Sequence, residues 1–405
     1  KEHALHFLRR GGLGSVSPDA FLEGLKGNDI LVPLTWDQWM AVEPPHEGVG
    51  FDIKEVTTRY ARNGYDWDIH GRLYTPEKET NGEIAFVFFH GGADSEMVFD
   101  ETPDGRPGQA RALAAQGFKV LTITYPGHYA PGNHWAEPIA TRQPIYLLDQ
   151  ALGLDENLDR NEKCTFNVIL QGAGQLVDEN LAGRRLLVWG HSTGGPMAVA
   201  LMEHTNNTVF GLLGFGSGGN DGWRRDWREE TGAEKDVIHP YGHMSRRSPD
   251  TYRASGYEDP EDLCPWGGPE ELFQWAENAH RSQMKTGLCD NQHRGQMASI
   301  ELWPPKTGLP RDEYFSHLEN PDPDWLKSIS VLFLVGDNDK GHWVAGKDIA
   351  DKRDMWMSKR YRESGVHRSH VALIPRYGHF GFMELHNEKF VYLWLWALKQ
   401  GYFEG

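Results

Sequence analysis

Apolar residues form short continuous runs that are separated by stretches with helical spacing. Two runs with strand character, 51–60 and 67–77, flank the sequence "ARNGYD", where Asn63-Gly64 is typical of a tight hairpin turn. Six further runs rich in β-branched and aromatic residues predict buried strands at 84–92, 119–128, 185–195, 208–219, 329–339 and 370–382. Helix-like stretches lie at 108–118, 143–158, 196–204 and 388–403. This alternation predicts an α/β fold with a mostly parallel central sheet and helices on both faces.

The spacing of the strands predicts how the chain is divided. About 110 residues separate the run 208–219 from the run 329–339, far more than the usual connection of about 2–6 residues around one helix. We therefore expect 51–219 and 328–405 to form one α/β domain, interrupted by an inserted, largely helical cap at 220–327. Six of the 15 tryptophans belong to this insertion: Trp223, Trp227, Trp266, Trp275, Trp303 and Trp325. Residues 1–50 are predicted to be an irregular N-terminal segment packed on the core.

Composition and charge narrow the classes of partner. The chain is 39% hydrophobic and 24% charged, which is ordinary for a globular protein. The formal net charge of −17 disfavours a nucleic acid partner, because a polyanion would be repelled. No stretch approaches about 18 consecutive apolar residues, so no membrane span is predicted. The sequence leaves the oligomeric state open.

The first residue and the cysteines leave two further questions open. Because the sequence starts at Lys1 and no signal-like segment follows, we expect that a signal peptide or a trimmed disordered start precedes it. Both a cytoplasmic and an exported location are compatible with that expectation. Cys264 and Cys289 could form one disulfide, but neither they nor Cys164 have the spacing of a metal site.

One short stretch carries the strongest chemical signal. The sequence "VWGHSTGGPMAVA" places Ser192 between a buried strand and a small-residue helix, with Gly190 and Gly194 two residues to either side. A serine that stands clear of a sheet needs a sharp, strained turn, in which side chains at both flanking positions would collide with the strand and the helix. Pro196 suits the first turn of the following helix. The pattern G-x-S-x-G in this context predicts that Ser192 is a nucleophile.

A serine nucleophile needs a base, and the base needs a carboxylate that orients it. His379 follows the run 370–382 in a Gly-His pair, and Asp337 and Asp339 follow the run 329–339. The order serine, acid, histidine at the ends of strands resembles the α/β-hydrolase superfamily, over about residues 51–219 and 328–405. The family often writes the acid as Gly-x-x-Asp, which maps to Gly336–Asp339 and favours Asp339 over Asp337. Asp221 is a further alternative, because some relatives take the acid from an earlier strand.

The resemblance also implies an oxyanion hole. In the family, backbone N–H donors come from the loop after the first buried parallel strand and from the residue after the nucleophile. In this sequence the loop donor maps to Gly92, with Gly91 as the second choice, and the residue after the nucleophile is Thr193. The preceding His90 is predicted to be structural rather than catalytic.

The expected activity is hydrolysis of a small-molecule carboxylic ester or lactone through an acyl-enzyme, with a catalytic triad of Ser192, Asp339 and His379. The aromatic insertion favours a medium-sized, apolar or aromatic substrate. Hydrolysis of a carbon–carbon bond or amide, acyl transfer, and ligand binding without catalysis stay open as alternatives, since the fold does not choose among them. His128, His134, His239 and His243 lack the further ligands of a metal site, so neither a metal nor a cofactor is predicted.

Overall fold

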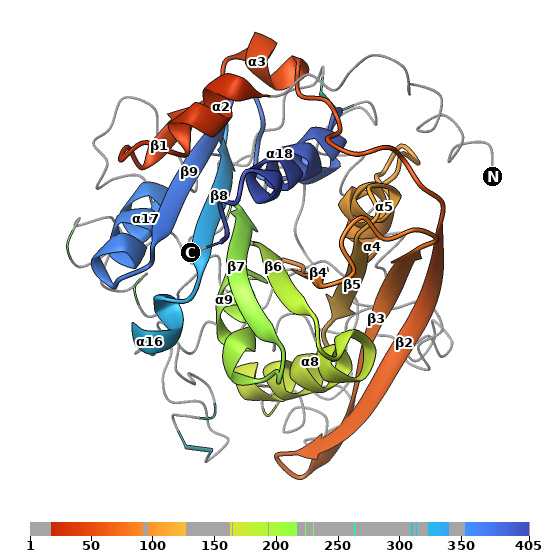
Figure 1. The fold of residues 1–405 in the computed structure, drawn as a ribbon. Coiled ribbons are helices and arrows are strands. Elements are labelled where there is room, and N and C mark those ends of the chain that lie inside the picture. Colours follow the sequence, from red (N-terminus) through yellow and green to blue (C-terminus); the bar gives the residue numbers. More distant parts are fainter. Residues whose placement is uncertain are drawn as a thin grey trace, which may run out of the picture.

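A computed structural model describes residues 18–91, 96–126, 163, 165–192, 194–216, 223, 230, 263–264, 309–310, 313, 323–339 and 353–404. The strands are β1 Leu31–Pro33, β2 Phe51–Arg62, β3 Tyr65–Pro76, β4 Ile84–Phe89, β5 Lys119–Thr124, β6 Arg185–His191, β7 Thr208–Phe215, β8 Ser330–Gly336 and β9 Arg368–Ile374. The α-helices are α2 Asp19–Gly24, α3 Trp36–Met40, α4 Met97–Asp100, α5 Gln109–Ala115, α8 Phe166–Leu181, α9 Gly194–Ala200, α16 Pro323–Leu326, α17 Arg353–Glu363 and α18 Glu388–Lys399. Two 3-10 helices, η3 Leu201–Glu203 and η7 Gly381–Met383, complete the described elements (Figure 1).

The described strands form one twisted sheet of nine strands in the order β1-β9-β8-β7-β6-β4-β5-β3-β2. Neighbours from β1 to β5 are parallel, whereas β3 and β2 are antiparallel and form the predicted hairpin. The register brings the carboxyl ends of five strands to one edge, where the paired residues are Phe89 with Gly190, His191 with Phe215, and Gly336 with Ile374. The loops that follow these strands therefore start close together.

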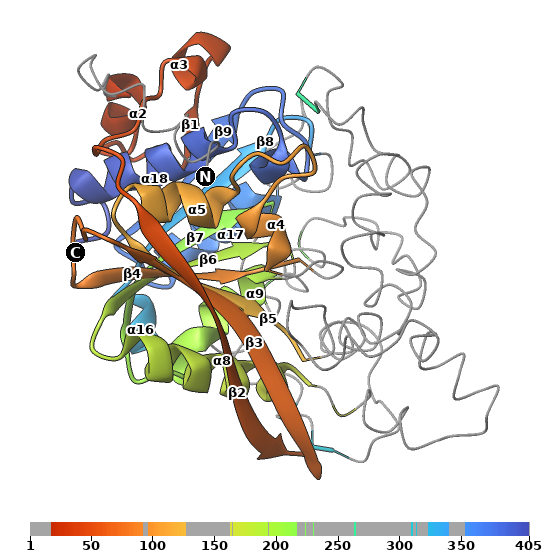
Figure 2. The same cartoon turned by 90° about the vertical axis from the view of Figure 1, so that its right-hand side faces the viewer.

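Helices cover both faces of this sheet, as the sequence predicts. Successive residues of β4 alternate between two hydrophobic cores, with Phe86 and Phe88 on one face and Val87 and Phe89 on the other. The first core is completed by α5 and α18, the second by α8, α9 and α17. Figure 2 shows α5 and α18 above the sheet and α8 below it. The mostly parallel sheet thus lies between two layers of helices, which is the arrangement expected of the α/β-hydrolase fold.

Helix α8 was not predicted from the sequence. A crossover helix was expected at 143–158, which lies outside the described residues, and α8 occupies 166–181. Its two interior glycines weaken the helical signal but have a packing reason. A Cβ at Gly172 would lie 2.3 Å from the ring of Tyr60, and one at Gly174 would lie 1.7 Å from the carbonyl oxygen of His204. Both glycines allow α8 to approach its neighbours closely.

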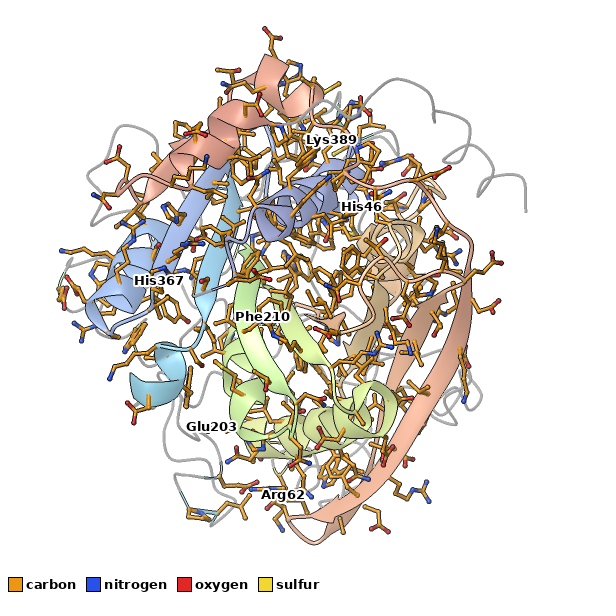
Figure 3. The ribbon with its side chains drawn as sticks, viewed as in Figure 1. His46, Arg62, Glu203, Phe210, His367 and Lys389 are labelled. Atoms are coloured by element: carbon orange, nitrogen blue, oxygen red, sulfur yellow. The ribbon has the colours of Figure 1, made fainter. Side chains whose placement is uncertain are left out.

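The N-terminal segment is more regular than expected. Residues 31–33 add β1 to the sheet edge beside β9, between the short helices α2 and α3. Lys389 of α18 donates hydrogen bonds to the carbonyl oxygens of Met40 and Val42, at 2.9 and 2.6 Å, and Figure 3 shows its position beside α3. A charged amine that caps two carbonyl groups fixes this segment on α18.

Candidate active site

Ser192 occupies a strained turn between β6 and α9. Its φ of 49° lies in the left-handed region, which costs a residue other than glycine about 1–2 kcal/mol. A Cβ at Gly190 would lie 2.4 Å from the carbonyl oxygen of Gly194, and one at Gly194 would lie 2.3 Å from that of Phe89. Both glycines of the G-x-S-x-G pattern are therefore needed for backbone to pack against backbone. The turn leaves Ser192 partly exposed, whereas His191 before it is buried.

Asp339 and His379 meet at the same edge of the sheet. His379 Nδ1 lies 2.8 Å from Asp339 Oδ2, and the two residues are 3% and 0% exposed. Because a carboxylate can only accept a hydrogen bond, Nδ1 of His379 carries the proton of this contact, and Nε2 is the ring nitrogen that the carboxylate does not engage. This is the geometry that orients a general base.

The end of β7 makes room for this pair and connects it to Ser192. A Cβ at Gly216 would lie 2.7 Å from His379 Nδ1 and 2.8 Å from Asp339 Oδ2, so only glycine fits. The backbone N–H of Ser192 donates to the carbonyl oxygen of Phe215, the residue before Gly216, at 3.3 Å. The structure thus brings Ser192, Asp339 and His379 to one place.

Asp337, one of the two alternative acids, has a different partner. Asp337 Oδ1 accepts the backbone N–H of Arg376 at 2.5 Å, which ties the loop after β8 to the loop after β9. Burial raises the pKa of Asp337, against the opposing effect of that hydrogen bond. Asp221 lies outside the described residues.

The predicted oxyanion loop is described only at its start. Gly91 is described, whereas Gly92 and Thr193 lie outside the described residues. The ring of His90 stacks on Tyr125 with 3.9 Å between centroids, and its Nδ1 lies 2.6 Å from the carbonyl oxygen of Gly91. Because a carbonyl accepts, Nδ1 donates, and the peptide that opens the loop is fixed. His90 is fully buried and has structural contacts, in agreement with its predicted role.

A buried charged cluster lies directly after this loop. Asp100 Oδ1 and Oδ2 accept hydrogen bonds from Arg72, Arg111 and the hydroxyl of Tyr74, all at 2.7–2.9 Å. Glu96 is 1% exposed, and its Oε1 lies 3.8 Å from Arg72 Nε. Burial raises the pKa of Glu96 to about 8, against the opposing charge of Arg72. The sequence analysis did not identify this cluster.

Two further residues near the Asp339–His379 pair were not predicted. Asp354 of α17 is fully buried, and burial raises its pKa to about 7, with the charge of Asp339 adding to the rise. His191, the residue before Ser192, places its Nε2 2.9 Å from the carbonyl oxygen of His379. The second letter of "GHSTG" is the one signal in the sequence that could have drawn attention to His191.

Several described residues from the long connection between β7 and β8 contact the rest of the fold. Glu230 accepts a hydrogen bond from Trp356 of α17 at 3.0 Å, and the ring of Trp223 packs 4.9 Å from that of Tyr361, also on α17. The carbonyl oxygen of Leu263 accepts the backbone N–H of Leu385 at 2.9 Å, in the loop after His379. These contacts connect the insertion to α17 and to the loop that carries His379.

Glu313, which belongs to the same connection, is fixed at the tip of the β2–β3 hairpin. Its carboxylate accepts hydrogen bonds from Arg62, Asn63 and the hydroxyl of Thr165, at 2.5–2.8 Å, and Figure 3 shows Arg62 at this tip. Burial opposes ionisation of Glu313, but these donors outweigh it and hold its pKa below the ordinary value.

Two searches of the described residues give negative results. Within the described ranges, no helix is both long and apolar enough to cross a membrane. Nor do three or more His, Cys, Asp or Glu side chains gather there in a way that could hold a metal ion. Cys264 is buried, and Cys289 lies outside the described residues.

Comparison with known proteins identifies a family. A sequence model described as "Alpha/beta hydrolase family" matches residues 86–391 of the 405. A search among curated proteins finds no match. A probable hydrolytic enzyme from Pseudomonas aeruginosa is similar in structure, with a TM-score of 0.51 and 14% identity over 87% of this chain and 96% of that one. An esterase from Thermogutta terrifontis gives a TM-score of 0.45 and 14% identity, over 86% of this chain and 99% of that one. An epoxide hydrolase from Vigna radiata gives a TM-score of 0.48 and 12% identity, over 85% of this chain and 98% of that one.

Proposed function

The chain belongs to the alpha/beta hydrolase family, and from that premise we propose that it is a serine hydrolase that cleaves a carboxylic ester or lactone through an acyl-enzyme. The observation that carries the proposal is the 2.8 Å hydrogen bond between His379 and Asp339, at the strand ends beside the strained turn of Ser192. A serine in this position suits nucleophilic attack on a carbonyl carbon.

In the proposed mechanism, Ser192 Oγ attacks the carbonyl carbon while His379 Nε2 takes the hydroxyl proton. Asp339 accepts the Nδ1–H and stabilises the imidazolium that forms. The backbone N–H groups of Thr193 and Gly92, with Gly91 as the second choice in that loop, bind the oxyanion. Loss of one such donor costs about 2.7–4 kcal/mol of transition-state stabilisation.

The second half of the reaction reuses the same groups. The tetrahedral intermediate collapses, and the alkoxide leaves with the proton from His379 Nε2, which gives the alcohol and an acyl ester on Ser192. Water, deprotonated by Nε2, then attacks this ester and releases the acid, and the proton returns to Ser192. No redox or group-carrying cofactor enters this balance.

The insertion at 220–327 is proposed to be a cap that sets substrate choice. The contact of Leu263 with the loop after His379 supports its placement at the catalytic edge. Because apolar pocket walls discriminate between substrates by about 10–200-fold, alanine at Trp227, Trp266 or Trp275 should change relative rates on bulky and small esters by that range. These three tryptophans lie outside the described residues. Equal effects on bulky and small esters would contradict the cap proposal.

The experiment that tests the hydrolase proposal is a screen of ester, lactone and amide libraries with the wild type, Ser192→Ala and a control, Ser328→Ala. Ser328 is exposed and donates a local hydrogen bond to the carbonyl oxygen of Trp325, away from the site. We expect Ser192→Ala to lose about 10⁴–10⁶-fold in rate on whichever class is cleaved, with an unchanged fold. Substantial activity in Ser192→Ala would overturn the proposal.

A further inference from the structure

His191 lies between the proposed nucleophile and the proposed base. It ends β6, directly before Ser192, and its side chain reaches across to the loop after β9. Its Nε2 lies 2.9 Å from the carbonyl oxygen of His379. Since a carbonyl oxygen can only accept, Nε2 of His191 carries the proton and donates. One side chain thus joins the strand end that presents Ser192 to the main chain of His379.

The surroundings of His191 exclude water from this hydrogen bond. The residue is 1% exposed. Four aromatic rings pack around its imidazole, with centroid separations of 4.4 Å for Phe382, 5.7 Å for Phe380, 6.4 Å for Trp189 and 6.5 Å for Phe215. A hydrogen bond in such an environment is stronger than one in water, because no solvent competes for the donor or the acceptor.

The acceptor makes this contact relevant to chemistry. The ring of His379 lies 4.7 Å from that of His191 and has its own hydrogen bond to Asp339. Asp339 fixes one end of the imidazole, and the main-chain position of His379 decides where the other end points. A displacement of about 1 Å in such a group can cost about 10²-fold in rate.

We propose that His191 is a positioning residue. Its Nε2–H fixes the backbone of His379 relative to Ser192, so that the distance and orientation between the nucleophile and the base stay constant. The proposal rests on the proposed hydrolase function, which it deepens. His191 does not touch the reacting atoms in this account. Its effect is transmitted through the carbonyl group of His379.

The test separates the hydrogen bond from simple packing. In His191→Gln the amide nitrogen can occupy the place of Nε2 and still donate to the carbonyl oxygen. The leucine of His191→Leu fills much of the same volume but has no hydrogen-bond donor. The asparagine of His191→Asn has a donor, but its side chain is too short to bring that donor to the carbonyl oxygen of His379. The matched control is His370→Leu, because His370 is also buried, with its Nε2 3.3 Å from the carbonyl oxygen of Gly27 and its Nδ1 2.9 Å from the hydroxyl of Tyr402.

Two readouts are needed. The first is kcat and KM on the best ester from the screen. We expect His191→Leu and His191→Asn to lose about 10²-fold in kcat with little change in KM, while His191→Gln and His370→Leu stay near the wild type. If His191→Leu fails to fold, the contrast between His191→Asn and His191→Gln gives the same answer. Equal kcat values for the Gln and Asn variants, whether both high or both low, would overturn the proposal.

The second readout does not depend on hydrolysis. The Nδ1 proton of His379, shared with Asp339, gives a proton NMR signal far downfield that reports the position of this ring. We expect the signal to shift or broaden in His191→Asn and to be preserved in His191→Gln. If the wild type hydrolyses nothing in the screen, the proposed function fails and this signal alone decides the inference. An unchanged signal in His191→Asn would then overturn it.

Discussion

Asp339 and Asp100 are both buried aspartates, yet the side chains that they pair with differ in kind. Asp339 is 0% exposed and pairs with the imidazole of His379, a ring whose two nitrogens can donate or accept a proton. Asp100 is 3% exposed and accepts from the guanidinium groups of Arg72 and Arg111, which never release theirs in a protein. Burial of a carboxylate is common to both sites. The chemistry of the partner makes one site suited to proton transfer and the other to holding the structure together.

The largest expected effect is on activity at the imidazole-paired site. Asp339→Asn should lower kcat by about 10⁴-fold, because an amide no longer favours the Nδ1–H tautomer of His379. Thermal unfolding should change little by comparison. Steady-state kinetics on the best ester measure this effect, and Asp337→Asn serves as the matched control, since Asp337 bonds the backbone of Arg376 instead. A greater loss in Asp337→Asn than in Asp339→Asn would contradict the assignment of the acid.

The next effect is on stability, at the guanidinium-paired site. Asp100→Asn leaves Arg72 and Arg111 without their shared carboxylate, and breaking a buried ion pair in this way costs about 3–5 kcal/mol in the free energy of unfolding. Urea unfolding measures that free energy. The kcat of the folded fraction should stay close to that of the wild type. If Asp100→Asn kept the full free energy of unfolding but had a greatly reduced kcat, the structural role assigned to Asp100 would be wrong.

A smaller effect is expected at Glu313, whose pKa is lowered in the folded chain. Such a group adds stability above its unfolded pKa, and this stability is lost as the pH falls through the folded pKa. Glu313→Gln should therefore cost about 1–3 kcal/mol in the free energy of unfolding near pH 7. The difference from the wild type should disappear in acid below the ordinary glutamate range. A cost that persists unchanged there would mean that the carboxylate charge is not what holds this residue at the hairpin tip.

An effect of opposite sign is expected at Glu96. Its folded pKa of about 8 lies above the unfolded value, so its contribution to stability is fully present below the unfolded pKa and is lost as the pH rises through about 8. Glu96→Gln stays neutral throughout. Relative to the wild type, this variant should gain stability between pH 5 and pH 8, as measured by paired urea titrations. The same difference at both pH values would show that Glu96 is ionised throughout.

Most of the sheet could be predicted from the sequence because its central strands are apolar on both faces. Continuous runs such as 84–89 and 330–336 have no competing interpretation once glycine or polar clusters end them. The short edge strand β1 and the helix α8 were missed for different reasons. Three residues of β1 are too few for a periodic signal, and the glycines of α8 are explained by contacts with Tyr60 and His204 that exist only in the folded chain.

The residues of the candidate site also fall into two groups, those that could be predicted from the sequence and those that could not. Ser192, Asp339 and His379 could be selected because each follows a strand within a short local pattern, and parallel strands bring those ends together. The contact of His191 with His379 and the cluster around Asp100 each join side chains from different elements of the fold. No local pattern marks them, since their partners are determined by the packing of the loops. Gly92 and Thr193 stay predictions from the family resemblance.

The measurement that tests the central claim most directly is covalent labelling by a fluorophosphonate, which reacts with an activated serine hydroxyl. Intact mass and peptide mapping would locate the adduct in the wild type, in Ser192→Ala and in Asp339→Asn. We expect one adduct on Ser192 in the wild type, none in Ser192→Ala, and much slower labelling in Asp339→Asn. Rapid labelling of a different residue, or an inert wild type that is folded, would contradict this expectation.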